Sequence, residues 1–149
     1  MTQSVPSPRN LVLYADDDVE DRQLIRDAFD EFSNSIDLLD FEDGAGLLRY
    51  VEQLEALQPK PCLIIIDINM PRLDGKETLR RLRKLDGFED VPAVLFSTST
   101  LPSEAAFARC FNAGFVTKPL HTTQIQQIVD VLMEHCNDEI KKRLHRNKG

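Results

Sequence analysis

The chain has few cysteines and no long apolar run, and so lacks the features that are typical of secreted, membrane-spanning or zinc-binding proteins. Its three cysteines, Cys62, Cys110 and Cys136, fit neither a zinc-site spacing nor a C-x-x-C redox pair. No apolar run approaches the roughly 18 residues that a membrane span needs. The first ten residues, "MTQSVPSPRN", lack the apolar stretch of a secretory signal. We therefore expect a cytoplasmic protein with buried thiols and no membrane partner.

Positive charge is also scarce. The net charge of −7 at pH 7 disfavours nucleic acid as a partner for the body of the protein. Basic residues are concentrated only in the final "KKRLHRNKG", which is compatible with a tail for an acidic partner or with a solvated helix end. A length of 149 residues predicts one domain. We place this domain at 10–134, between an N-terminal tail (1–9) and a basic extension of the last helix (135–149).

What the sequence does contain is a series of short apolar runs. Most of them lack polar alternation, which is typical of strands buried on both faces of a parallel sheet. The runs are "LVLYA" (11–15), "CLIII" (62–66), "AVLF" (93–96) and the shorter "FV" (115–116). A weaker strand is predicted over 35–41.

Segments with helical spacing separate these strands. Apolar residues recur three and four positions apart within 24–32, 47–54 and 79–85. A short helix opened by Ser103 is expected over 103–111, and the last helix should begin with a capping box of Thr123 and Gln126. This alternation predicts an α/β fold with a doubly wound, five-stranded parallel sheet and helices on both faces.

Polar residues stand at the carboxyl ends of the predicted strands, where open α/β sheets bind ligands. Asp16 and Asp17 follow the first run, and Asp67 follows "CLIII". Ser97 follows "AVLF", and Lys118 comes just after "FV". Since all these strand ends meet at one edge of a parallel sheet, we expect the five side chains to lie together.

Three carboxylates at one edge require a cation. Each pair at 4 Å repels by about 1 kcal/mol in water and by about 4 kcal/mol at an effective dielectric constant of 20. Oxygen ligands with room for water suit Mg²⁺ or Mn²⁺. Lys118 and the Ser97 hydroxyl add a positive charge and a donor. The sequence therefore predicts a site for a transferring phosphoryl group, with a carboxylate as the candidate nucleophile.

Four stretches resemble the receiver domains of two-component response regulators, the CheY-like family. They are "YADDDVEDR" (14–22), "IIIDINMPRLDG" (64–75), "LFSTS" (95–99) and "GFVTKP" (114–119). Each stretch alone is modest, but the four occur in the right order at the ends of the right strands. The resemblance implies a flavodoxin-like (CheY-like) fold over residues 10–134 and a phosphorylation-dependent switch.

The resemblance also implies roles for the acidic residues. Asp67 would be the phosphoacceptor, taking the phosphoryl group from a phosphohistidine of a sensor histidine kinase or a histidine phosphotransfer protein. Asp17 would bind the metal directly and Asp16 through water. Asp67 itself and the backbone carbonyl of Asn69 would complete the metal site.

Residues of the fourth and fifth strands receive roles in the same way. Lys118 would pair with the phosphoryl oxygens, and Ser97, with Thr98 beside it, would bind one of them. Phe115 matches the aromatic that moves inward as the hydroxyl is recruited, so Ser97 and Phe115 form the implied switch. Two structural roles follow as well: a cis peptide at Pro119 would aim Lys118 at the site, and Gly75 would permit a tight loop beside it.

Other interpretations of the acidic run are weaker. A haloacid dehalogenase-type phosphatase needs D-x-D-x-[TV], but Glu20 occupies the last position of that motif. A calcium loop starting at Asp16 would have Asp21 where Gly is needed and Asp27 in place of Glu. Asp18, Glu20 and Asp21 are instead expected in a first helical turn. A receiver-shaped adaptor that is never phosphorylated stays open as an alternative.

We therefore expect a stand-alone receiver that is not an enzyme beyond slow self-dephosphorylation. Its output would be a contact made by residues 103–135, the face that the resemblance implies, with a target protein or a second copy of the chain. Ile140 and Leu144 are compatible with either a dimer arm or a fraying helix end.

Overall fold

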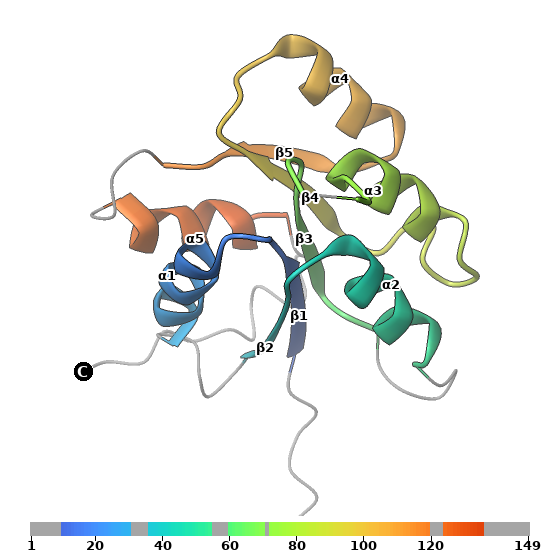
Figure 1. The fold of residues 1–149 in the computed structure, drawn as a ribbon, viewed down its shortest axis with the longest axis horizontal. Helices are drawn as coiled ribbons and strands as arrows, with labels where there is room; N and C mark the ends of the chain where they lie inside the picture. The colour runs from blue at the N-terminus through green and yellow to red at the C-terminus, as the bar shows by residue number, and fades with distance from the viewer. Residues whose placement is uncertain (1–9, 31–35, 55–59, 71, 120–123, 136–149) are drawn as a thin grey trace, which may run out of the picture.

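The computed structural model describes residues 10–30, 36–54, 60–70, 72–119 and 124–135, in which strands and helices alternate (Figure 1). The strands are β1 (Asn10–Ala15), β2 (Ile36–Phe41), β3 (Leu63–Asp67), β4 (Ala93–Ser97) and β5 (Gly114–Thr117). The helices are α1 (Val19–Phe29), α2 (Gly44–Glu52), α3 (Gly75–Arg83), α4 (Pro102–Cys110) and α5 (Ile125–Met133). Each strand is followed by a helix, as the sequence predicted.

The five strands form one sheet in the order β2-β1-β3-β4-β5, and every neighbouring pair is parallel. The predicted doubly wound fold is therefore confirmed. The chain steps outward from β1 to β2 and then returns to β3 on the other side of β1, so the strand order reverses between β1 and β3. Ligands bind at this point in open α/β sheets, beyond the carboxyl ends of the strands.

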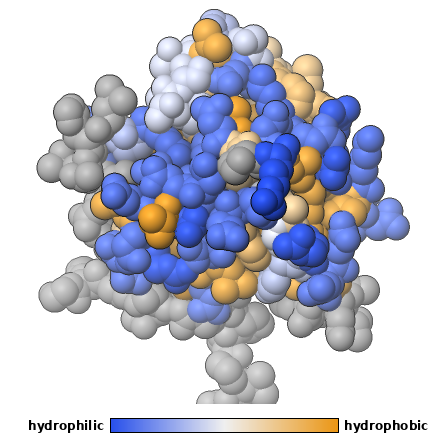
Figure 2. Space-filling view, in the orientation of Figure 1, coloured by the Kyte–Doolittle hydropathy of each residue, from blue (hydrophilic) through white to orange (hydrophobic). Residues whose placement is uncertain are grey.

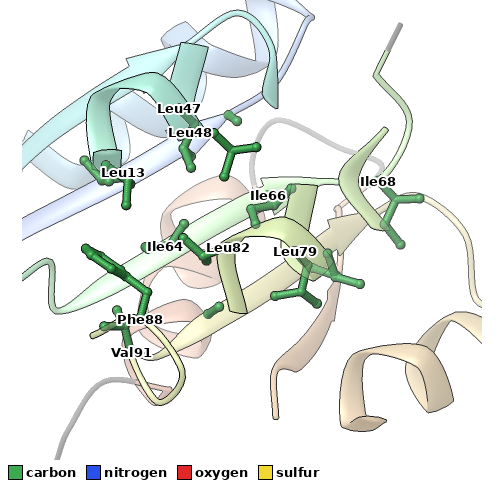
Figure 3. Packing of buried hydrophobic residues seen from close by; sticks show 14 of the residues in the cluster. Leu13, Leu47, Leu48, Ile64, Ile66, Ile68, Leu79, Leu82, Phe88 and Val91 are labelled. Atoms are coloured by element: carbon green, nitrogen blue, oxygen red, sulfur yellow. The ribbon is translucent and has the colours of Figure 1, made fainter. Parts of the chain in front are cut away.

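Two hydrophobic layers hold the helices against the sheet. Because side chains alternate along a strand, Val12 and Tyr14 face α1 and α5, whereas Leu13 and Ala15 face the other helices. Figure 3 shows the second layer, in which side chains from β1 and β3 meet those of α2 and α3. The outer face in the view of Figure 2 is mainly hydrophilic, with separate hydrophobic patches.

Aspartates begin the first three helices. Asp18, Asp43 and Asp74 are the N-caps of α1, α2 and α3, and each carboxylate accepts a hydrogen bond from a backbone N–H of the first turn. The expected start of α4 at Ser103 is wrong. The helix begins at Pro102, because proline lacks the N–H that a first helical position leaves unbonded and its φ is already helical.

Some expectations lie outside the described residues. These are the cap at Thr123, the continuation at Ile140 and Leu144, and the burial of Cys136. Among the other cysteines, Cys62 is buried as expected but Cys110 is exposed, because it ends α4 on the side away from the sheet. No helix in the described part of the chain is both long and apolar enough to cross a membrane.

Candidate functional site

The carboxyl edge of the sheet brings three aspartates together. Asp16 and Asp17 follow β1, and Asp67 is the last residue of the neighbouring strand β3. One carboxylate oxygen from each lies within 4.8 Å of the others. Asp16 and Asp67 are buried, whereas Asp17 is exposed to solvent. The cluster therefore has two fixed inner carboxylates and one that faces the outside.

The Asp16 carboxylate accepts three hydrogen bonds from protein donors. Its Oδ2 accepts hydrogen bonds from the Tyr14 hydroxyl at 2.6 Å and from Lys118 Nζ at 2.7 Å. Its Oδ1 accepts from the Asp18 backbone N–H at 3.0 Å. We had not predicted the Tyr14 contact, although residues i and i+2 of a strand share a face. The protein thus holds Asp16 in place from three sides.

Lys118 is the cation at the centre of the cluster. Its Nζ lies 2.7 Å from Asp16 Oδ2, 2.9 Å from Asp21 Oδ2 and 3.5 Å from Asp67 Oδ1. Burial alone would lower the pKa of Lys118, but the bonds and charges of the three aspartates outweigh it and raise that pKa. Lys118 is therefore firmly protonated.

Asp21 is a second residue that the sequence interpretation missed. It was expected only as an acid that complements the dipole of α1. Since α1 begins directly after the aspartate pair, its first turn lies against the sheet edge, and Asp21 reaches Lys118. The position of a first-turn acid beside a strand-end lysine could have suggested this pair.

Asp67 has fewer and longer contacts to protein donors than Asp16, the other buried carboxylate of the cluster. Burial raises its pKa to about 7, Lys118 opposes this rise, and the charge of Asp16 adds to it. The Asn69 backbone N–H lies 3.4 Å from Asp67 Oδ1, a long contact. Lys118 lies closer to Asp16 and Asp21 than to Asp67. The negative charge of Asp67 is therefore only partly neutralised by the protein.

The donor set fits a hard divalent cation. All three side chains offer carboxylate oxygens, the ligands that Mg²⁺ and Mn²⁺ prefer. Asp17 is exposed, so water and a phosphoryl oxygen can reach its side of the cluster. A cation here would also relieve the unfavourable burial of Asp67.

Ser97 and Thr98 take different positions at the end of β4. Ser97 is buried, and its Oγ accepts a hydrogen bond from the Ser99 N–H at 3.0 Å. Its backbone carbonyl accepts from the Lys118 N–H at 2.7 Å, which ties β4 to the start of the next loop. Thr98 is exposed and lines a cavity of about 70 Å³ together with Lys118 and Pro119.

Two further residues shape the surroundings of the cluster. Phe115 of β5 is half-buried and packs on the layer of α2, α3 and α4. A Cβ at Gly75 would lie 2.3 Å from the Asp67 carbonyl oxygen and 2.7 Å from Ile68 Cα, so a side chain would clash with backbone. Only glycine lets α3 begin this close to the end of β3.

The expected cis peptide at Pro119 is wrong. The described residues contain no cis peptide bond, and the bond between Lys118 and Pro119 is trans. The trans form is the intrinsically favoured one for an X–Pro bond. Lys118 reaches Asp16 and Asp21 from this conformation.

The two rival interpretations of the acidic run conflict with this geometry. Asp18 Oδ1 accepts the backbone N–H groups of Glu20 and Asp21, so the carboxylate caps α1 and does not pair with Asp16 as a phosphatase motif would. Residues 19–29 form one continuous helix, which leaves no twelve-residue calcium loop.

Comparison with known proteins now identifies the family. The model of the response regulator receiver domain matches residues 12–130. The chain belongs to this family. This match confirms the resemblance to receiver domains over most of residues 10–134.

The relatives of this receiver domain differ in size and name. The two-component response regulator ARR7 of Arabidopsis thaliana is 27% identical, and the match covers 97% of this chain and 73% of ARR7. Response regulator Rcp1 of Synechocystis sp. is 25% identical, with coverage of 62% and 65%. A protein-glutamate methylesterase/protein-glutamine glutaminase of Trichodesmium erythraeum is 27% identical over 93% of this chain but only 38% of its own length.

Solved structures support the fold. The phosphorylated cyanobacterial phytochrome response regulator RcpA superposes with a TM-score of 0.77 at 24% identity, covering 89% of this chain and 96% of RcpA. The Mn²⁺-bound form of Rcp1 has a TM-score of 0.72 at 21% identity, covering 84% of this chain and 92% of Rcp1.

Proposed function

We propose that this receiver domain takes a phosphoryl group on Asp67 from a phosphohistidine of a sensor histidine kinase or a histidine phosphotransfer protein. The supporting observation is the buried Asp67 carboxylate, 3.5 Å from Lys118 and within 4.8 Å of two further carboxylates. In the transfer, an Asp67 oxygen attacks phosphorus, the phosphorus–nitrogen bond breaks, and its electron pair stays with the imidazole. The chemistry needs mainly positioning and charge stabilisation.

The remaining residues hold the phosphoryl group. Lys118 pairs with its oxygens, and the Ser97 hydroxyl, with Thr98 beside it, donates to one of them. Pro119 and Gly75 fix the loops on either side of the site. Lys118 can reach the phosphoryl group although the peptide bond before Pro119 is trans.

A divalent metal, Mg²⁺ with Mn²⁺ as a substitute, belongs to the same proposal. Asp17, Asp67 and the Asn69 carbonyl would bind it directly and Asp16 through water. This division is supported by the exposure of Asp17 and by the three protein donors that already occupy Asp16. The bound metal would neutralise charge on the phosphoryl oxygens.

The proposed output is a change of contact rather than catalysis of a second reaction. Phosphorylation adds about 1.5 to 2 negative charges at Asp67. Ser97 and Phe115 would respond, and residues 103–135 would then bind a target protein or a second copy. The site would work in the cytoplasm, with residues 1–9 and 135–149 as tails outside the switch.

Intact mass after incubation with Mg²⁺ and acetyl phosphate tests the proposal. We expect one phosphoryl adduct per chain, and none with Asp67→Asn or with EDTA. Asp74→Asn is a matched control, because Asp74 caps α3 outside the cluster and should leave the adduct unchanged. An adduct that persists in Asp67→Asn would refute the assignment. Repeated turnover of phosphate esters would favour a phosphatase instead.

A further inference from the structure

Tyr14 is a buried tyrosine that the proposed transfer does not use. Its side chain is fully buried, and its ring meets the Phe96 ring edge-on, with centroids 6.4 Å apart. The hydroxyl donates to Asp16 Oδ2 over 2.6 Å, a short bond between a neutral donor and a charged acceptor. Burial and the neighbouring Asp16 charge raise the pKa of Tyr14, so it remains a donor.

The same Asp16 oxygen is also bonded to Lys118. Nζ of Lys118 is 2.7 Å from Asp16 Oδ2 but 3.5 Å from Asp67 Oδ1. Without a phosphoryl group, the lysine is therefore closer to Asp16 than to Asp67, the residue whose phosphoryl group it is proposed to bind. A phosphoryl group on Asp67 must draw Lys118 away from Asp16. Asp21 is partly exposed and can exchange its lysine for bulk water, whereas Oδ2 of the fully buried Asp16 has only Lys118 and the Tyr14 hydroxyl as protein donors.

We propose that Tyr14 is a positioning residue that keeps Asp16 bonded while Lys118 moves to the phosphoryl group. This inference rests on the proposed phosphorylation of Asp67. With Tyr14 present, Asp16 Oδ2 retains one donor after the lysine shifts. Without the hydroxyl, the shift leaves a buried charged oxygen with no protein donor, which is a costly state.

The proposal predicts effects in different directions for two ligands. In Tyr14→Phe, beryllofluoride, which occupies the place of the phosphoryl group, should bind about tenfold more weakly because it requires the lysine shift. Mg²⁺ alone leaves Lys118 where it is, and loss of the hydroxyl dipole makes the Asp16 charge more available to a cation. Mg²⁺ affinity should therefore be unchanged or higher. A general loosening of the site would weaken both ligands.

Isothermal titration calorimetry with Mg²⁺, and with beryllofluoride at saturating Mg²⁺, measures both affinities. Tyr50→Phe is the matched control, because Tyr50 is the only other tyrosine and lies on α2 beside Phe41. It should leave both affinities within twofold. A double-mutant cycle with Asp16→Asn adds a second readout, since Tyr14→Phe should have no effect on beryllofluoride binding once Asp16 is uncharged.

The outcomes separate this inference from the function on which it rests. If the wild type does not bind beryllofluoride, the proposed function and the role of Tyr14 both fail. If the wild type binds it but Tyr14→Phe does so equally well, or loses Mg²⁺ and beryllofluoride affinity in equal measure, only the role of Tyr14 fails. A Tyr14→Phe effect that persists in Asp16→Asn also overturns it.

Discussion

Arg83 is half-buried and Lys118 is buried, and the two cations have different partners. Arg83, the last residue of α3, donates to four backbone carbonyls, those of Phe88, Val91, Phe111 and Asn112. Lys118 instead faces three carboxylates at unequal distances. Burial lowers the pKa of Arg83, whereas the acids raise that of Lys118. Arg83 is held by neutral acceptors that are fixed in the backbone, whereas Lys118 is shared among charged side chains, as its proposed shift to the phosphoryl group requires.

The two cations also lie at opposite edges of the sheet. The carbonyls bound by Arg83 belong to segments that precede β4 and β5, and Lys118 directly follows β5. The segments that lead into β4 and β5 are thus held together by polar groups whose hydrogen bonds are made. The carboxyl edge concentrates like charges that only an added cation can balance. The residues that stabilise the fold and those proposed to function thus lie at opposite ends of the same strands.

Removing the movable cation should have the largest effect. In Lys118→Met, beryllofluoride affinity should fall at least about 100-fold, because both the charge and its hydrogen bonds are lost. The variant should also be less stable by roughly 3 kcal/mol at pH 8 without metal, since Asp16 becomes a buried acid without its cation. Calorimetry and urea unfolding measure the two effects. Near-wild-type beryllofluoride affinity would contradict the role of Lys118.

Removing the fixed cation should affect stability alone. Arg83→Met should lower the free energy of unfolding by about 2 to 4 kcal/mol, because several carbonyls lose their donor at once. Arg83→Lys should recover less than half of this loss, because an ammonium cannot reproduce the planar fork of the guanidinium. Beryllofluoride affinity should stay within twofold in both variants. A larger change in that affinity would mean that the two edges are coupled.

The titration of Asp67 should make the stability of the protein depend on pH. Its pKa is raised from 3.8 to about 7 in the folded state, so the folded protein binds more protons than the unfolded chain between these values. This carboxyl therefore lowers stability as the pH rises from about 4 to 7. In EDTA, Asp67→Asn should gain roughly 1 to 2 kcal/mol over the wild type between pH 4 and pH 8.

Urea unfolding of both proteins across this pH range is the measurement. Arg83→Met serves as the control, because its difference from the wild type should stay constant with pH. A difference between Asp67→Asn and the wild type that also stays constant would show that Asp67 titrates normally.

The sequence predicted the sheet better than it predicted the site. Strands buried on both faces give unbroken apolar runs, so their order and number could be read along the chain. The start of α4 was misplaced because a proline at the first helical position was taken for a residue outside the helix. Asp21 was missed because its partner, Lys118, lies 97 residues further along the chain and is brought there only by folding. Tyr14 was missed although its partner, Asp16, lies only two residues away on the same face of the strand.

The smallest expected effect concerns Asp21, the most exposed of the three aspartates that contact Lys118. In Asp21→Asn, Lys118 loses a competing partner, so beryllofluoride should bind about two- to threefold more tightly, while stability falls by at most about 1 kcal/mol because the pair is partly solvated. Asp27→Asn, an acid on the same helix without a contact to Lys118, is the matched control. Weaker binding in Asp21→Asn would mean that Asp21 positions Lys118 for the phosphoryl group instead of restraining it.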